Sequence, residues 1–402
     1  MANVSSSNGL EKRPKLRFPG FDEPWKETAL SSVLTERNEY AEKDGTYEHA
    51  TLSKEGIYGK TARYDRDFLV STENKKYKVT HLGDLCYNPA NLKFGVICLN
   101  TYGDAIFSPI YVTFEIEASF DPDFIGAYLT RWDFINRALK YQQGTVYERM
   151  AVSPEDFVSI KCCFPQKAEQ TRLAEFITLL DKRIAAQGKY VESLKKYKRG
   201  VMQSIFRHSS QDGWNTVKLG TIFKKVSRRN TNGGIKNVIT NSAEYGLIPQ
   251  RDFFDKDIAV DGNTSNYYVI DEGDFVYNPR KSNTAPYGPF NRYTLKEKGI
   301  ISPLYTCLVL QADINPAYLA WYFKSDAWYR YIYDNGSQGV RHDRVSMTDD
   351  LLMGIPVSFP VISKQRKIAE LLDAIEYRQS VTQSEYDMMI KLRNGFMQQL
   401  FT

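Results

Sequence analysis

The chain has 402 residues, of which 25% are charged and 13% are aromatic, and its formal net charge is +5 at pH 7. This length suggests two or three domains with hydrophobic cores. It contains no run of 18 apolar residues, so we expect no helical membrane span, and because its N-terminus is polar and basic we expect no secretion signal. The five cysteines form no CxxC pair, so we expect a reducing cytoplasm, no disulfides and no structural zinc.

Taken in chain order, the sequence predicts mixed α+β domains. We expect the polar residues 1–17 to be a disordered N-terminal segment. Short β-forming runs bounded by Gly, Asn and Pro follow at 76–80, 95–99, 109–116, 236–240, 267–270 and 304–310. Helical patterns lie near 122–140 and 315–333. Small sheets carrying loops and a few helices are typical of the α+β class.

Two long helices are predicted at 170–206 and 365–401. Their sequences align without a gap at one constant offset, and both end in Gly-x-Met-Gln-x-x-Phe. Apolar residues recur in steps of four and three, which indicates a coiled-coil seam, and polar residues interrupt the seam at matching positions of both helices. The two helices are therefore expected to pair. The alternative is that each one packs on its own domain.

An internal repeat also covers the segments before the helices. Four short motifs occur once in each half: WKETAL and WNTVKL, GDLCYNP and GDFVYNP, FSPIY and ISPLY, and Phe-Pro before each helix. Gly-Asp-x-x-Tyr-Asn-Pro predicts a turn entering a strand that ends in a bend. The predicted organisation has two similar domains and two coiled-coil helices, with domains at 18–165 and 207–360 and helices at 166–206 and 361–402.

Catalytic motifs are not found in the sequence. It has no nucleotide-binding GxxxxGK[ST] or GxGxxG, no HExxH and no GxSxG, and its four histidines show no metal-ligand spacing. Asp67 with Glu73-Asn74-Lys75 weakly resembles an acidic nuclease centre, but a solvated charge run explains these residues better. We therefore expect neither catalytic residues nor a metal site.

Nucleic-acid binding has better support. The positive net charge attracts phosphate, and loops at matching places in the two halves mix cations, aromatic residues and amides. Arg reads guanine and Asn or Gln reads adenine, although any single such loop is equally well explained as an ordinary polar loop. The candidate DNA-binding residues are Lys54, Tyr58, Lys60, Arg63, Asn91, Lys93, Tyr147, Arg149, Arg280, Lys281, Asn283, Tyr287, Gln338, Arg341, His342 and Arg344.

Over nearly its whole length the chain resembles the specificity (S) subunits of type I restriction–modification systems. The resemblance rests on Pro14–Phe21 followed by Trp25, on the Tyr-Asn-Pro turns, and on the motifs that begin and end the long helices. It implies two target-recognition domains separated by an antiparallel helix pair, and each domain would read one half of a bipartite asymmetric site in double-stranded DNA.

The resemblance also implies the partners. A chain of this family has no catalytic residues and binds no cofactor of its own. It recruits two modification subunits, which methylate adenine with S-adenosylmethionine, and two restriction subunits, which translocate and cut DNA with ATP and Mg²⁺, in cytoplasmic defence against phage.

Two alternatives remain at this point. A stand-alone nuclease or methyltransferase with duplicated DNA-binding domains would be active as a purified chain. A coiled-coil scaffold that binds proteins would show no steep salt dependence of DNA binding, because no counterions would be released from DNA.

Overall fold

A computed structural model describes residues 13–60, 76–144, 150–207, 213–252, 264–336 and 343–401. The chain divides into two compact units, which are Met1–Gln187 with Glu385–Thr402, and Gly188–Ser384. Both divisions fall inside the long helices, so each unit contains part of both helices. No helix among the described residues is long and apolar enough to span a membrane.

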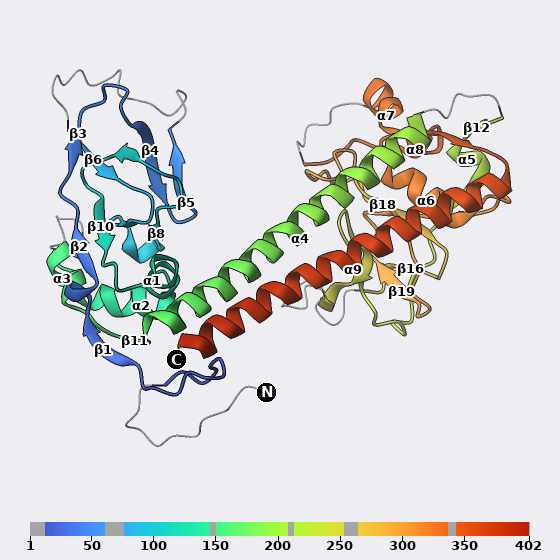
Figure 1. The fold of residues 1–402 in the computed structure, drawn as a ribbon. Coiled ribbons are helices and arrows are strands. Elements are labelled where there is room, and N and C mark those ends of the chain that lie inside the picture. Colours follow the sequence, from blue (N-terminus) through green and yellow to red (C-terminus); the bar gives the residue numbers. More distant parts are fainter. Residues whose placement is uncertain are drawn as a thin grey trace. The chain divides into compact units, whose positions relative to one another are not determined.

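The described residues of the first unit form three sheets (Figure 1). Two strands pair antiparallel, β1 (Lys26–Ala29) and β11 (Lys161–Phe164). A four-stranded sheet has the order β2 (Leu34–Glu36), β10 (Val112–Ile116), β7 (Leu85–Tyr87), β8 (Ile97–Leu99). A five-stranded sheet has the order β3 (Tyr40–Ala41), β6 (Tyr77–Thr80), β9 (Ala105–Phe107), β4 (Glu48–Ser53), β5 (Gly56–Gly59).

The helices of the first unit cover one core. They are α1 (Pro122–Leu129), α2 (Trp132–Ala138) and α3 (Pro154–Ser159), with 3₁₀ turns at Leu30–Ser32, Leu92–Phe94 and Leu139–Tyr141. Asp121 caps α1 by accepting a hydrogen bond from the Phe124 amide, and Pro122 occupies the first turn, where no donor is needed. The buried face of α1 includes Phe124 and Leu129, which join the main hydrophobic cluster of this unit.

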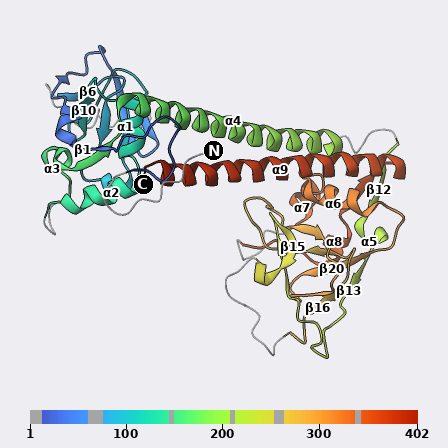
Figure 2. The same cartoon turned by 60° about the horizontal axis from the view of Figure 1, so that its bottom comes forward.

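The second unit has corresponding sheets (Figure 2). β12 (Asn215–Lys218) pairs with β21 (Pro356–Phe359). A four-stranded sheet has the order β13 (Phe223–Val226), β20 (Thr306–Leu310), β17 (Phe275–Tyr277), β18 (Phe290–Arg292). Two further pairs are β14 (Ile239–Ser242) with β15 (Gly246–Pro249), and β16 (Tyr268–Ile270) with β19 (Gly299–Ile301).

The helices of the second unit are α5 (Leu219–Ile222), α6 (Pro316–Lys324), α7 (Tyr329–Asn335) and α8 (Asp349–Met353), with a 3₁₀ turn at Gln250–Asp252. Asn315 caps α6 as Asp121 caps α1, since its side chain accepts from the Ala317 and Tyr318 amides. The predicted mixture of small sheets and helices is therefore confirmed in both units.

The long helices are α4 (Lys167–Arg207) and α9 (Ile362–Phe401), close to the predicted limits. In the first unit the start of α4 and the end of α9 lie side by side (Figures 1 and 2). Asp181 pairs with Arg393 at 2.6 Å, and Gln187 donates to Glu385 at 3.0 Å. From Asp181 to Gln187 the residue numbers rise along α4, while those of their partners on α9 fall from Arg393 to Glu385. The two helices therefore run antiparallel in this unit.

The apolar residues of the predicted seam are all buried or half-buried, namely Leu173, Ile177, Leu180, Ile184, Val191, Leu194, Val201 and Ile205 of α4 and Ile368, Leu372, Ile375, Tyr386, Met389, Phe396 and Leu400 of α9. The helix ends also join the domain cores, because Leu173 and Phe401 belong to the cluster of the first unit, and Phe206 and Leu372 to that of the second. Packing on the domains and pairing between helices, which the sequence offered as alternatives, therefore both contribute to the burial of these helices.

The N-terminal segment differs from the prediction at its end. Residues 1–12 lie outside the described part of the chain, but the Leu16 amide donates to the Gln399 carbonyl at 3.1 Å. Arg17 makes two hydrogen bonds of 2.7 Å to Glu169, which is 1% exposed. The prediction of disorder was wrong for Leu16 and Arg17, because a polar composition does not reveal that a buried carboxylate lies beside the arginine.

Candidate nucleic-acid interface

Both units hold their Gly-Asp turn by the same kind of ion pair. In the first unit Asp84 accepts two hydrogen bonds from Arg37, of 2.9 and 3.1 Å, and one from the His81 amide. The hydrogen bond to Asp84 is the main reason why the pKa of Arg37 is raised. In the second unit Asp274 takes the same place and pairs with Arg228. Each turn then leads into a buried central strand.

The Tyr-Asn-Pro motifs end these strands in bends, as predicted. The buried side chain of Asn88 accepts hydrogen bonds from the amides of the second and third residues after it. Asn278, also buried, accepts from the Arg280 amide at 3.0 Å. This local bond to the backbone fixes the direction in which the chain leaves the sheet. Each unit therefore presents a loop from the same anchor.

The loop of the second unit brings three predicted cations together. Arg280 and Arg344 face each other in an antiparallel bridge, and the Lys281 amide donates to the Asp343 carbonyl at 2.9 Å. Burial raises the pKa of Tyr305, although the positive charges of Arg280 and Arg344 oppose this shift. Arg280, Lys281 and Arg344 are called the cation cluster below. Its field attracts phosphate.

A groove of about 360 Å³ lies beside the cation cluster. One wall is the β14–β15 hairpin and the other is the loop after β17. Most of the lining residues are polar, and the lining consists of Thr240, Asn241, Ser242, Ala243, Glu244, Asn278, Arg280, Lys281, Ser282, Thr284, Pro289 and Tyr305. Glu244 and Tyr305 were not among the predicted residues. The available signals were the Glu-Tyr-Gly hairpin turn, with Gly246 at a positive φ of 76°, and the repeated Ser-Pro-x-Tyr motif.

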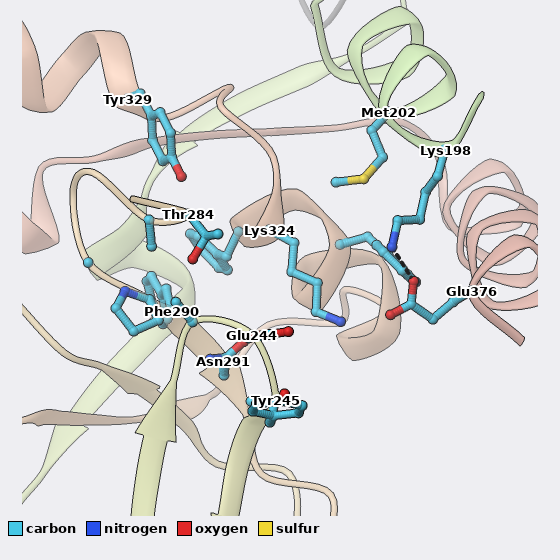
Figure 3. A pocket seen from close by; sticks show the side chains of 17 residues that line it. Lys198, Met202, Glu244, Tyr245, Thr284, Phe290, Asn291, Lys324, Tyr329 and Glu376 are labelled. Atoms are coloured by element: carbon cyan, nitrogen blue, oxygen red, sulfur yellow. Dashed lines mark hydrogen bonds and ion pairs between the residues drawn. The ribbon is translucent and has the colours of Figure 1, made fainter. Parts of the chain in front are cut away.

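A second cavity, of about 340 Å³, is also lined by the hairpin tip and shares Ala243, Glu244, Thr284 and Pro289 with the groove (Figure 3). Figure 3 shows Lys198 of α4 paired with Glu376 of α9, and Glu244 and Tyr245 on the hairpin. Lys324 of α6 also lines it, with its Nζ atom 4.5 Å from the centre of the Trp321 ring. This cavity combines aromatic surface with the Lys198–Glu376 ion pair and a second carboxylate, Glu244, so it offers less to phosphate than the groove does.

Two other predicted residues of the second loop have different surroundings. Asn283 is exposed. Tyr287 is half-buried, its carbonyl accepts a 2.7 Å hydrogen bond from the Tyr277 hydroxyl, and its ring lies 5.0 Å from that of Tyr329. Tyr287 therefore supports the loop, and only part of its surface is available to a ligand.

The predicted residues of the first unit lie in two places. Lys54 and Tyr58 are exposed on the β4–β5 hairpin, and the Lys60 amide continues its ladder by donating to the His49 carbonyl. Asn91 and Lys93 lie in the loop after β7. Among the described residues no hydrogen bond or ion pair joins the two places, so nothing equivalent to the cation cluster forms here.

The loop after β7 instead carries aromatic surface. Phe94 is 60% exposed and Trp132 is 57% exposed. The Nζ atom of Lys93 lies 5.2 Å from the centre of the Phe94 ring. Gly95, at a φ of 77°, closes the turn, and a Cβ atom there would lie 3.4 Å from the Trp132 ring. The same anchor thus presents different chemistry in the two units.

Six predicted residues lie outside the described part of the chain. They are Arg63, Tyr147, Arg149, Gln338, Arg341 and His342. Among the residues that are described, no group of three or more His, Cys, Asp or Glu side chains is placed to hold a metal ion.

His81 gives the first unit a pH-dependent contact. Burial lowers its pKa, but hydrogen bonds to Asp104 (3.0 Å) and Glu39 (3.1 Å) outweigh burial, and the net pKa is raised above the ordinary value of 6.5. A raised pKa in the folded state stabilises the fold at low pH, and this contribution is lost as pH rises through the folded-state pKa. We expect hydrogen-exchange protection of β6 to fall in that window above pH 6.5.

The matched variants for this pH prediction are His81→Gln and Glu42→Gln. His81→Gln should flatten the pH dependence of β6 protection, whereas Glu42→Gln, an exposed carboxylate on the segment after β3, should leave it unchanged. An equal pH dependence in the wild type and in His81→Gln would show that other groups control the stability of this sheet.

Comparison with known proteins identifies the fold. No protein-family model and no curated protein sequence matches the chain. Among solved structures, the type I restriction–modification S subunit from M. genitalium aligns with a TM-score of 0.54 and 15% identity, covering 97% of this chain and 99% of its own. A chain from a structural study of complex assembly and conformational transition of the type I R–M system aligns with a TM-score of 0.54 and 16% identity, covering 95% and 98%.

Proposed function

We propose that this chain, which has the fold of type I restriction–modification S subunits, is the DNA-specificity subunit of such a complex. The fold similarity extends over nearly the whole of both chains, and this observation carries the proposal. At this level of identity the similarity concerns the fold. The assignment to DNA therefore also depends on the cation cluster and the groove beside it.

Each unit reads one half of a bipartite site in this proposal. This proposal is supported by the loops that follow the Gly-Asp and Tyr-Asn-Pro motifs. Both units have such a loop, but the two loops carry different side chains. Arg280 and Lys281 extend one loop, while Lys93 and Phe94 extend the other. A common scaffold with different contact residues is what reading two unlike half-sites requires. Cations that reach phosphate position the protein, and contacts to base edges give specificity.

The helices α4 and α9 set the distance between the half-sites as an antiparallel coiled coil. Two ion pairs support this arrangement, Asp181 with Arg393 in the first unit and Glu376 with Lys198 in the second. By the offset of the sequence repeat, Asp181 corresponds to Glu376 and Lys198 to Arg393. Matched polar pairs along an apolar seam specify register and direction.

The reactions belong to other subunits. This chain is not an enzyme and binds no cofactor. Two modification subunits dock on the helices and supply methylation of adenine with S-adenosylmethionine, and two restriction subunits supply ATP- and Mg²⁺-dependent cleavage. The proposed role places the chain in the cytoplasm, in defence against phage DNA.

The test is methylation with and without partners. Purified alone with S-adenosylmethionine, the chain is expected to leave DNA unmethylated. Produced with its modification subunits in a host that lacks other adenine methyltransferases, it should direct methylation to one split sequence, which single-molecule sequencing detects. Turnover by the chain alone would support a stand-alone enzyme instead. Methylation that is independent of this chain would refute the specificity role.

A further inference from the structure

The groove in the second unit is held open by a buried hydrogen-bond network. Asn241 Nδ2 on the hairpin donates to the Val276 carbonyl at 2.9 Å, and Asn278 Nδ2 donates to the Asn241 carbonyl at 3.3 Å. Asn291 Nδ2 donates to Asn241 Oδ1 at 2.7 Å. All three asparagines are less than 9% exposed. Because an unpaired buried amide is costly, this network fixes one wall of the groove against the other.

The two walls carry opposite charges. Arg280 and Lys281 come from the loop wall, and Glu244 comes from the hairpin wall. Arg280 and Glu244 are exposed, and within the described residues neither they nor Lys281 has an ion-pair partner. The charged groups on both walls can therefore form hydrogen bonds with a ligand, and the buried asparagine network already holds the two walls in position.

Glu244 decides which ligand the groove fits. A site that only bound phosphate would not place a free carboxylate on its rim, because the two negative charges repel each other. A carboxylate can only accept hydrogen bonds, so it needs a donor from the ligand. In the major groove of DNA the base-edge donors are the amino groups of cytosine and adenine, and arginine fits the two acceptors of guanine.

We infer that the groove of the second unit reads a G·C base pair from the major groove, with Arg280 donating to guanine and Glu244 accepting from the cytosine amino group. This inference rests on the proposed function and specifies one base pair of one half-site. Lys281 and Arg344 contact the flanking phosphates. An A·T pair fits less well, because adenine offers arginine only one acceptor beside a donor.

The experiment selects duplexes from a random pool with the full chain in complex with its modification subunits. The wild type is expected to select a G·C pair at one position of one half-site. Arg280→Gln should change the preference there from guanine to adenine or reduce it by about tenfold or more, and Glu244→Gln should relax the same base pair. The other half-site should be unchanged, which shows that each variant is folded.

Matched controls use exposed residues of the same unit that do not line the groove. Lys296→Gln and Glu272→Gln make the same changes of charge, and both should select the wild-type sequence. If Arg280→Gln weakened binding to all sequences equally, Arg280 would be a phosphate contact and the inference would be overturned.

Two further outcomes separate this inference from the proposed function. If the wild type selected a bipartite site that both groove variants also selected unchanged, the G·C assignment alone would fail. If the wild-type complex selected no sequence at all, the specificity role itself would fail, and the inference with it.

Discussion

Insertion of seven residues into α4 after Gln187, together with seven into α9 after Ser384, should lengthen the unread spacer of the DNA site by about three base pairs. One heptad, about two helical turns, adds about 10 Å at 1.5 Å per residue. The rise of the duplex is about 3.4 Å per base pair. Both insertion points lie at the division between the compact units, so the contacts within each unit are retained. Both half-site sequences should persist in the methylome.

Insertion into only one of the two helices is the control for this test of spacer length. Seven residues added to only one helix would offset the ion pair of Asp181 with Arg393 from that of Glu376 with Lys198. Such a variant should lose bipartite recognition. Some loss of affinity is expected even for the double insertion, because three base pairs also rotate one half-site around the duplex. Full activity of the double insertion on the original spacer would show that the helices do not set this distance.

The second large effect, on stability, is expected at Gln170 and Gln365. Each of these side chains joins a long helix to its domain by two equivalent hydrogen bonds. Gln170 donates to the Pro165 carbonyl at 2.8 Å and accepts from the Asp121 amide at 3.0 Å. Gln365 donates to the Pro360 carbonyl at 2.8 Å and accepts from the Asn315 amide at 2.8 Å. Both glutamines are about 98–99% buried.

Gln170→Leu should destabilise the first unit by about 2–4 kcal/mol, because it leaves a carbonyl and an amide unpaired, each at a cost of about 1–3 kcal/mol. Hydrogen exchange followed by mass spectrometry measures the loss of protection unit by unit. Gln365→Leu should weaken the second unit in the same way. Gln399→Leu, at an exposed helical position, is the matched control and should change neither unit. A loss shared equally by both units after Gln170→Leu would argue against independent fastening.

Some features could be predicted from the sequence because neighbouring residues determine them. The seam of α4 and α9 follows from the spacing of residues such as Ile177 and Leu372, since helical periodicity places them on one face. The bends at Asn88 and Asn278 follow from the reach of an asparagine side chain to the amides just after it. The matching motifs also showed that the two halves have a common plan.

Other features depend on which distant segments of the chain pack together. Arg344 faces Arg280, and Glu244 lines the same groove, although long stretches of sequence separate them. Likewise Arg17 pairs with the buried Glu169, in a segment whose composition suggested disorder. Periodicity and turn chemistry determine local structure, but these approaches follow from strand pairing and core packing between distant segments. Local sequence therefore specifies the elements and the internal repeat, whereas packing between distant segments specifies which charges meet at the groove.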